Sequence, residues 1–149
     1  MARFTLERVI RAAPADVFAA AIDPELHLAS MARYGETMAK GPEHGTFTEG
    51  STVTWRARHF GVPFHLTSIV FDIAPPHRFR DRQTQGPFAE FHHEHVFEQH
   101  PQGTLMRDTI DFRSPFGPIG AVVDRLFMRE YLRRLIDERG AVLQASLES

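Results

Sequence analysis

The sequence predicts an α+β fold in which a curved antiparallel sheet of six to seven strands wraps around one long C-terminal helix, with two short helices after the first strand. From residue 51 to residue 113, apolar and polar residues alternate with the period of two that is typical of strands. After Pro118 there is no further proline, and apolar residues recur close to helical spacing. Since a long amphipathic helix needs a long apolar surface to lie on, we expect the sheet to provide it.

The N-terminal third predicts one strand and two short helices. Residues Arg3–Arg11 carry β-branched and aromatic side chains between charges, which favours a strand. Pro14 suits the first turn of a helix over Ala15–Ile22, because its missing N–H would have no partner there. A second short helix is expected from Glu25 to about Met31, and one short strand near Glu36–Lys40.

The first long hairpin is predicted around the turn at Gly61-Val62-Pro63, with strands over residues 51–59 and 64–73. The alternation places three apolar side chains on the inner faces of these strands: Trp55, Ile69 and Phe71. The opposite face of the second strand carries Ser68 and Asp72, so we expect that face to be solvated.

Three further strands are expected between Arg78 and Arg113, joined by turns at Gly86-Pro87 and Pro101-Gln102-Gly103, and they combine apolar and ionisable residues on one face. The inner face of the middle strand carries Phe91, His93, His95 and Phe97, so two histidines point inward with the phenylalanines. The same rule places further side chains inward on the two flanking strands: Asp81, Gln83, Met106, Asp108 and Ile110.

Hairpin registers predict which of these side chains meet. Asp81 is expected opposite His93, and Asp108 opposite His95. Directly opposed residues have Cβ atoms ~5 Å apart, which is close enough for His–Asp hydrogen bonds. We therefore expect an inward polar cluster of Asp81, Gln83, His93, His95 and Asp108 on an otherwise apolar face.

The C-terminal helix is expected from Ile119 to about Leu147. Its inward positions include Val122, Leu126, Leu132, Leu135 and Ile136, with arginines and glutamates supplying much of the solvated face. Five histidines outside these patterns are expected in surface or loop positions: His27, His44, His77, His92 and His100.

Composition narrows the functional classes. A chain of 149 residues suits one domain over residues 1–149, and a net charge of −2 gives no one-sign field for nucleic acid. The absence of cysteine excludes disulfides and thiol catalysis. No stretch resembles a signal peptide or approaches the ~20 apolar residues of a membrane span, so we expect a cytoplasmic protein. Thirteen phenylalanines can fill a core and line a cavity for an apolar ligand.

Several segments carry a resemblance to a known family: Ala12–Phe18, Gly50–Trp55, Phe60–Pro63, Pro76–Gln83, Gly86–Phe88, Gly103-Thr104 and Pro115–Pro118 before the long helix, with Phe91, His93, His95, Phe97 and Asp108. Together they resemble the START-like, or SRPBCC, superfamily with the helix-grip fold, and most closely its cyclase/dehydrase-type bacterial members. The resemblance covers nearly the whole chain. It implies a deep hydrophobic pocket between the curved sheet and the C-terminal helix. Members bind lipids, quinones, polyketides or plant hormones, and some catalyse cyclisation or dehydration, so fold alone does not decide function.

The inward His/Asp cluster has three interpretations. The first is a general acid/base, with candidates His93, His95, Asp108 and Asp81. The second is a structural network of polar groups that satisfy one another's hydrogen bonds. The third interpretation is a metal site, because an HxH strand with a nearby carboxylate can ligate Zn²⁺ or Fe²⁺. Cupins use such a strand, but their spacing requires a histidine at the position of Glu94. We therefore expect no metal and no cofactor.

The leading hypothesis is binding of a hydrophobic small molecule, such as a lipid, quinone or polyketide-like compound, between sheet and helix. The alternative is a polyketide cyclase/dehydratase-type enzyme that uses the His/Asp cluster. A weaker third hypothesis is an adaptor with a large exposed apolar patch. The protein is expected to be a monomer or a homodimer. The predicted ligand-binding residues are Trp55, Ile69, Phe71, Gln83, Phe91, His93, His95, Phe97, Met106, Asp108, Ile110 and Leu126.

Overall fold

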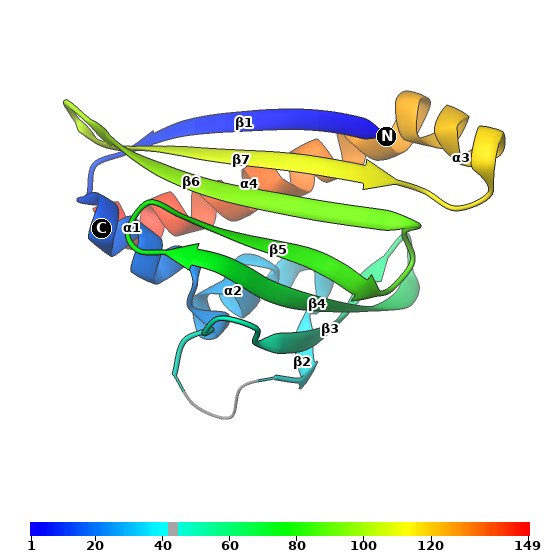
Figure 1. Cartoon of the computed structure of the whole chain (residues 1–149), viewed down its shortest axis with the longest axis horizontal. Helices are drawn as coiled ribbons and strands as arrows, with labels where there is room; N and C mark the ends of the chain where they lie inside the picture. The colour runs from blue at the N-terminus through cyan, green and yellow to red at the C-terminus, as the bar shows by residue number, and fades with distance from the viewer. Residues whose placement is uncertain (42–44) are drawn as a thin grey trace.

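The computed structural model describes residues 1–41 and 45–149, so His44 lies outside the described residues. It shows a curved antiparallel sheet with a long C-terminal helix lying across one face (Figure 1). Within the described residues the sheet has seven strands in the order β1-β7-β6-β5-β4-β3-β2, which confirms the predicted fold class. The strands are β1 Ala2–Ile10, β2 Thr37–Lys40, β3 Thr52–His59, β4 Val62–Ala74, β5 Arg78–Gln85, β6 Glu90–His100 and β7 Gly103–Arg113.

The helices also follow the predicted order. Helix α1 (Pro14–Ala21) begins at the expected proline, and α2 (Pro24–Ser30) is capped by Asp23, whose side chain accepts a hydrogen bond from the Glu25 N–H at 3.0 Å. A short 3₁₀ turn, η1, follows at Ala32–Tyr34. The C-terminal helix consists of α3 (Gly117–Val123), a wider π-helical turn η2 (Asp124–Met128) and α4 (Arg129–Glu148).

The predicted registers of the central strands are confirmed. Asp81 pairs with His93 across β5 and β6, and His95 pairs with Asp108 across β6 and β7. His93 lies opposite Ile110 in the same ladder. These pairings place the polar cluster in the middle of the sheet, on the face that α4 covers.

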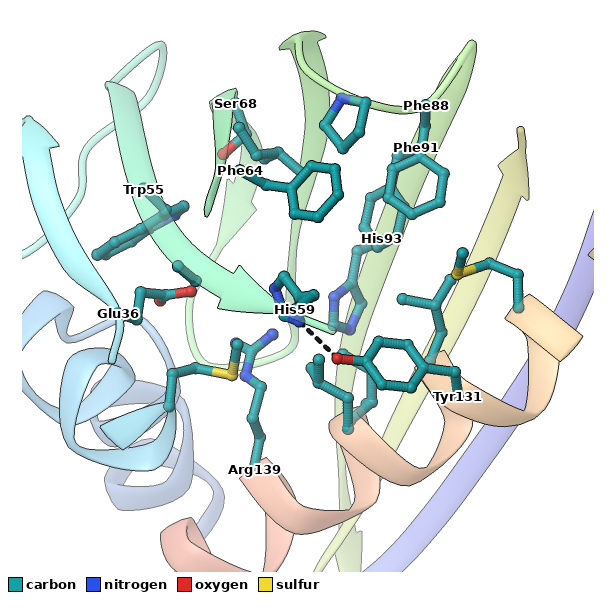
Figure 2. A pocket seen from close by; sticks show the side chains of 18 of the residues that line it. Glu36, Trp55, His59, Phe64, Ser68, Phe88, Phe91, His93, Tyr131 and Arg139 are labelled. Atoms are coloured by element: carbon teal, nitrogen blue, oxygen red, sulfur yellow. Dashed lines mark hydrogen bonds between the residues drawn. The ribbon is translucent and has the colours of Figure 1, made fainter. Parts of the chain in front are cut away.

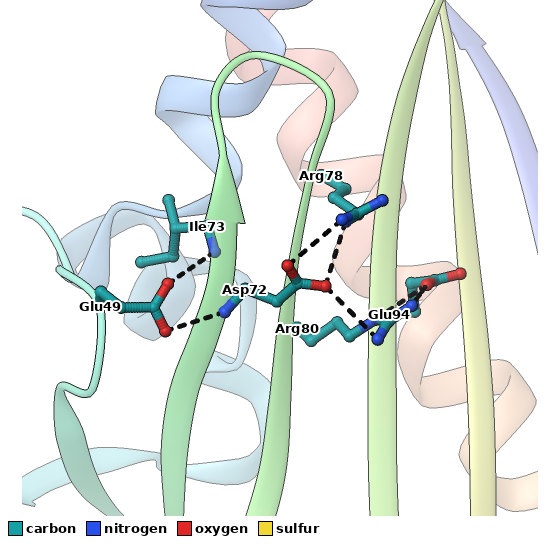
Figure 3. Close-up of polar contacts among 6 residues, drawn as sticks. All are labelled: Glu49, Asp72, Ile73, Arg78, Arg80 and Glu94. Atoms are coloured by element: carbon teal, nitrogen blue, oxygen red, sulfur yellow. Dashed lines mark hydrogen bonds and ion pairs between the residues drawn. The ribbon is translucent and has the colours of Figure 1, made fainter.

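Strand β4 contains a bulge at Asp72, which has a left-handed φ of 54°. The backbone N–H groups of Asp72 and Ile73 both donate to the Glu49 carboxylate, at 2.9 and 3.0 Å (Figure 3). The Asp72 carboxylate in turn accepts from Arg78 at 3.1 Å and lies 3.4 Å from an Arg80 nitrogen. An extra residue in one strand reverses the faces of all residues beyond it.

The bulge overturns one prediction. Ile73 packs against the core, but on the other side of the bulge Ser68 and Val70 are the buried residues, at 4% and 3% exposure. Ile69 and Phe71 therefore lie on the outer face of β4, where the Arg82 guanidinium sits 6.0 Å from the Phe71 ring. Their predicted inward orientation was wrong, because the strict alternation of two does not continue across the extra residue.

The core lies between the sheet and the helices. Phe18 of α1 packs edge-on against Phe79 and Phe97, with ring centroids 5.7 and 5.6 Å apart. At the other end, buried residues of α4 pack with residues of β1 and β7: Leu132, Leu135, Ile136, Phe4, Ile110 and Phe112. Each such side chain contributes roughly 1.5–3 kcal/mol by leaving water. Together they hold α4 against the sheet.

The first turns of the C-terminal helix do not join this core. Val122 and Leu126 are 48% and 78% exposed, so their predicted inward positions were wrong. In Figure 1, α3 projects beyond the end of the sheet, which leaves these side chains no apolar surface to cover. Among the described residues, no helix is both long and apolar enough to cross a membrane.

Candidate ligand-binding site

A cavity of about 310 Å³ lies between the sheet and α4 (Figure 2). This volume falls in the range of small-molecule sites, which are concave and mostly apolar with a few placed polar groups. Strands β3, β4 and β6 form one wall, and α4 forms the other. Apolar side chains make up much of the lining: Trp55, Phe64, Leu66, Phe91, Leu132 and Leu135.

Some of the predicted ligand-binding residues line this cavity. Trp55, Phe91 and His93 do so, and Asp81 joins them. His95, Met106 and Asp108 lie deeper, beside a smaller space of about 40 Å³ that His93 also borders. The inward cluster is therefore divided between a side that faces the cavity and a side that faces the core.

The other predicted lining residues have different surroundings. Gln83 holds the β5–β6 turn, because its amide donates to the Phe88 carbonyl at 2.8 Å and accepts from the Phe88 N–H at 3.2 Å. Phe97 and Ile110 are buried in the core at 2% and 0% exposure. Leu126 is solvent-exposed, and Ile69 and Phe71 belong to the outer face of β4.

Hydrogen bonds within the polar cluster run diagonally as well as straight across the sheet. His93 Nε2 lies 2.7 Å from Asp108 Oδ1, and His95 Nε2 lies 2.8 Å from Asp81 Oδ2. The other ring nitrogen of His95, Nδ1, is 3.3 Å from the same Asp108 oxygen. Each histidine thus contacts a carboxylate, and His95 contacts two.

The pKa values of the two histidines are shifted in opposite directions. Burial, reinforced by the neighbouring His95, lowers the pKa of His93 to about 4. Burial also acts to lower the pKa of His95, but the hydrogen bonds to Asp108 and Asp81 outweigh it and raise that pKa. Burial acts to raise the pKa of Asp108, yet the two histidines hold it well below its usual range. Near neutral pH, His93 is neutral, and as the pH falls His95 is the ring of this pair that takes up a proton first.

The protonation state fixes the role of each His93 nitrogen. Neutral His93 donates from Nε2 to the Asp108 carboxylate, so its lone pair is on Nδ1. The His93 side chain lines the cavity, which makes it a hydrogen-bond acceptor for a ligand hydroxyl.

The composition of the cluster also resembles a metal site, since Asp81, His93 and His95 offer ligand atoms within 4.8 Å of one another. The imidazole rings of His93 and His95, however, stack with centroids 3.7 Å apart and planes only 21° apart. Nitrogen lone pairs lie in the ring planes, so stacked rings direct them side by side and not toward one point. The geometry fits a hydrogen-bonded network better than a metal centre.

A second polar group was not foreseen from the sequence: His27, Glu36 and Arg139. Arg139 Nη2 donates to His27 Nδ1 at 2.9 Å, and His27 Nε2 lies 2.5 Å from Glu36 Oε1. The His27 ring stacks on Trp55 with centroids 4.0 Å apart. Its expected surface position was wrong, because α2 packs against α4 and covers it.

Arg139 is the cationic group of this cavity wall. In Figure 2 its side chain rises from α4 toward the cavity. Among the described residues, no carboxylate lies within ion-pair distance of its guanidinium. Burial and the Arg139 charge lower the pKa of His27, so that ring accepts from Arg139 as a neutral imidazole. The remaining Arg139 N–H groups are available to an acceptor oxygen on a ligand.

At the mouth of the cavity, a hydrogen bond joins the sheet to the helix. His59 Nδ1 of β3 lies 2.6 Å from the Tyr131 hydroxyl of α4 (Figure 2). Phe60 covers Tyr131, with ring centroids 4.6 Å apart. The α4 partners of these contacts could not be assigned from the sequence, because they depend on how α4 crosses the sheet.

The fold and the cavity define a helix-grip protein with an internal small-molecule-sized site. A family model described as "Polyketide cyclase / dehydrase and lipid transport" matches residues 1–148. The chain belongs to this family, which confirms the predicted START-like/SRPBCC membership. No curated protein sequence gives a significant match.

Solved structures with the same fold cover almost the whole chain at low sequence identity. TTHA0849 from Thermus thermophilus has 18% identity and a TM-score of 0.74, with 97% of this chain and 99% of that chain covered. CV1439 from Chromobacterium violaceum has the same identity and TM-score, with 100% and 99% covered. StfQ, a di-domain ARO/CYC from the steffimycin biosynthetic pathway, has 13% identity and a TM-score of 0.79, with 98% and 50% covered. At these identities the likeness establishes the fold.

Proposed function

We propose that this protein binds a hydrophobic small molecule in the cavity between the sheet and α4. The observation that carries the proposal is a cavity of about 310 Å³ whose walls are largely apolar and aromatic. A ligand that fills it removes apolar surface from water on both sides, which is the main source of affinity in such sites. The volume suits a fused-ring aromatic compound or a short acyl chain.

The polar groups on the walls narrow the ligand class. Arg139 has N–H donors without an ion-pair partner in the described chain, and these match a carbonyl or another acceptor oxygen. His93 has an acceptor nitrogen, which matches a hydroxyl. An apolar compound with keto and hydroxyl groups, such as a quinone or an aromatic polyketide, meets both requirements. The family description, which includes polyketide cyclase / dehydrase, agrees with this class.

A cavity-filling variant tests the proposal. Ala57 lines the cavity, so Ala57→Leu reduces the cavity volume without exposing new surface. We expect this change to weaken binding of the fluorescent probe anilinonaphthalene sulfonate at least tenfold. Ala145→Leu adds the same atoms on the exposed face of α4 and serves as the control. Equal probe affinity in both variants would contradict binding in the cavity.

A second candidate is a cyclase/dehydratase-type enzyme, favoured by one observation: His93, which is hydrogen-bonded to Asp108, borders an apolar cavity. The pKa of about 4 for His93 ranks this candidate second. General bases work best when their pKa is near the operating pH, and a pKa of this size makes His93 a weak base. The enzyme hypothesis predicts that His93→Gln abolishes turnover of an aromatic polyketide-type ketone while its binding is retained. Loss of binding and turnover together favours a binding role.

A further inference from the structure

An apolar ridge runs along the outside of α3 and the turn that follows it. We define the ridge by six exposed residues: Phe116, Ile119, Val122, Val123, Leu126 and Phe127. The helical members at 119, 122, 123 and 126 have the spacing of one helix face. Phe116 is 81% exposed, Ile119 70% and Leu126 78%. This face has the pattern of a buried helix surface, yet it faces solvent.

The orientation of the ridge is fixed by contacts on the opposite side of the helix. The buried Asp124 carboxylate accepts from the Ser114 N–H at 2.9 Å and from the Ser114 hydroxyl. Gly120 lies so close to the Pro115 carbonyl that any added Cβ would clash with it. The helix is thus anchored through a polar and close-packed face, and its apolar face is turned outward. The exposure of the apolar ridge therefore follows from the way the fold anchors this helix.

The ridge adjoins the mouth of the cavity. Phe127 contacts Phe60 of the β3–β4 turn, with ring centroids 5.4 Å apart, and Phe60 covers Tyr131. Phe60 and Tyr131 both line the cavity. Within the described chain, eight of the ten exposed large apolar side chains belong to the ridge or to Phe60 and Val62, so exposed apolar surface gathers at the mouth. Contiguous patches of this kind mark interaction sites.

The charged residues around the ridge indicate what kind of surface it would bind. Four exposed arginines lie within or just after it, at positions 125, 129, 133 and 134. They face two exposed acidic residues: Glu130, which pairs with Arg134 at 3.2 Å, and Asp137. The complete chain has a net charge of −2, so this positive group is local. A second copy of the chain would bring the same arginines face to face across a two-fold interface. A bilayer with anionic headgroups accepts both the apolar side chains and the guanidinium groups.

We infer that the apolar ridge docks on the surface of a bilayer that contains anionic lipid. The ridge lies in the interface with its apolar side chains among the acyl chains, and the arginines contact the lipid phosphates. Docking there brings the cavity mouth to the bilayer. A hydrophobic ligand then passes between membrane and cavity without crossing water, a consequence that rests on the proposed ligand-binding function.

Vesicle flotation with the full chain tests this inference. The probes are vesicles of phosphatidylcholine alone and of phosphatidylcholine mixed with phosphatidylglycerol. We expect the protein to float with the mixed vesicles, and we expect the double variant Phe116→Ser/Ile119→Ser to bind them at least tenfold more weakly. Val142→Ser removes another exposed apolar side chain, far along α4, and is expected to bind like the unmodified chain.

Three outcomes would overturn the inference. The first is an unmodified chain that floats with neither vesicle type, and the second is a double variant that binds as well as the unmodified chain. The third is a dimer in analytical ultracentrifugation that the double variant abolishes, which would assign the ridge to a second copy. Neither Phe116 nor Ile119 lines the cavity, so probe binding in solution stays unchanged in the variant. Loss of the membrane result is therefore distinguishable from failure of the ligand-binding proposal.

Discussion

His93 and His95 lie two residues apart on one strand with their ring centroids 3.7 Å apart. The pKa of His93 is nevertheless lowered, whereas the pKa of His95 is raised. The Asp108 carboxylate contacts both rings, and the Asp81 carboxylate hydrogen-bonds to His95. His95 can therefore hold a proton between two carboxylates, while a second buried charge beside it on His93 is disfavoured. This difference makes His93 the neutral, cavity-facing member of the pair.

The first prediction concerns Asp108, which holds both histidines. Asp108→Asn removes the charge that stabilises His95 and leaves a buried network short of one acceptor. We expect the free energy of unfolding to fall by about 3 kcal/mol, as for other broken buried pairs. Chemical denaturation measures this loss. Asp111→Asn, on the outer face of the same strand, is the matched control with an expected change of less than about 1 kcal/mol. Equal stabilities of the two variants would contradict the network.

The second prediction concerns the pH dependence of stability. The pKa of His93 is about 4 in the folded state and near 6.5 when unfolded, so the unfolded chain binds this proton first as the pH falls. Stability is therefore lost between pH 6.5 and pH 4, by roughly 3 kcal/mol from His93. His27 shifts in the same direction, whereas the raised pKa of His95 adds stability that is lost as the pH rises.

Denaturation curves across this pH range check the second prediction. In His93→Gln the curve of stability against pH is expected to flatten between pH 6.5 and pH 4, with His27 supplying the remaining slope. The control is His65→Gln, which alters an exposed histidine on the outer face of β4. An unchanged slope in His93→Gln would show that His93 titrates normally in the folded chain.

The third prediction concerns Arg139 and ligand chemistry. Arg139→Met removes N–H donors from the cavity wall but retains apolar volume. Hydrogen bonds to charged groups contribute about 1.5–3 kcal/mol, so we expect naphthoquinone to bind at least tenfold more weakly. Naphthalene has no carbonyl oxygen, and its affinity is expected to stay the same. Isothermal calorimetry with both compounds, and with Arg134→Met as control, distinguishes a polar role of Arg139 from loss of packing.

The fourth prediction concerns the mouth of the cavity. Tyr131→Phe removes the hydroxyl that bonds to His59 at 2.6 Å and joins the sheet to α4. A hydrogen bond of this kind contributes about 1 kcal/mol, which corresponds to about fivefold faster ligand dissociation. Stopped-flow fluorescence of the bound probe measures the rate. Tyr34→Phe removes a hydroxyl that bonds to Glu138 instead, and its dissociation rate is expected to match the unmodified chain.

The fold was predictable because its signals are local. Alternation over β5, β6 and β7 identified the strands and their inner faces, and tight turns set the registers that join Asp81 to His93 and His95 to Asp108. The failure in β4, in contrast, has a non-local cause. A bulge at Asp72 is held by Glu49 from a distant loop, and that loop contact has no signature within the strand itself.

Only those site residues that lie on strands of the sheet were predictable from the sequence. The His/Asp cluster follows from strand parity, whereas His27, Glu36 and Arg139 come from a short helix, a loop and the C-terminal helix. Their meeting depends on how those elements pack, which residue spacing does not encode. Helical spacing likewise identified the stripe through Leu126, but it did not show that the helix runs past the end of the sheet.

Native mass spectrometry of the protein purified from its own host tests the central claim most directly. We expect a bound small molecule, released on unfolding, that is present in the unmodified chain and in Ala145→Leu but depleted in Ala57→Leu. Its composition is expected to be apolar with keto or hydroxyl oxygens, to match Arg139 and His93. Bare protein, together with no gain in thermal stability from quinones, aromatic polyketides or fatty acids, would contradict a ligand-binding function.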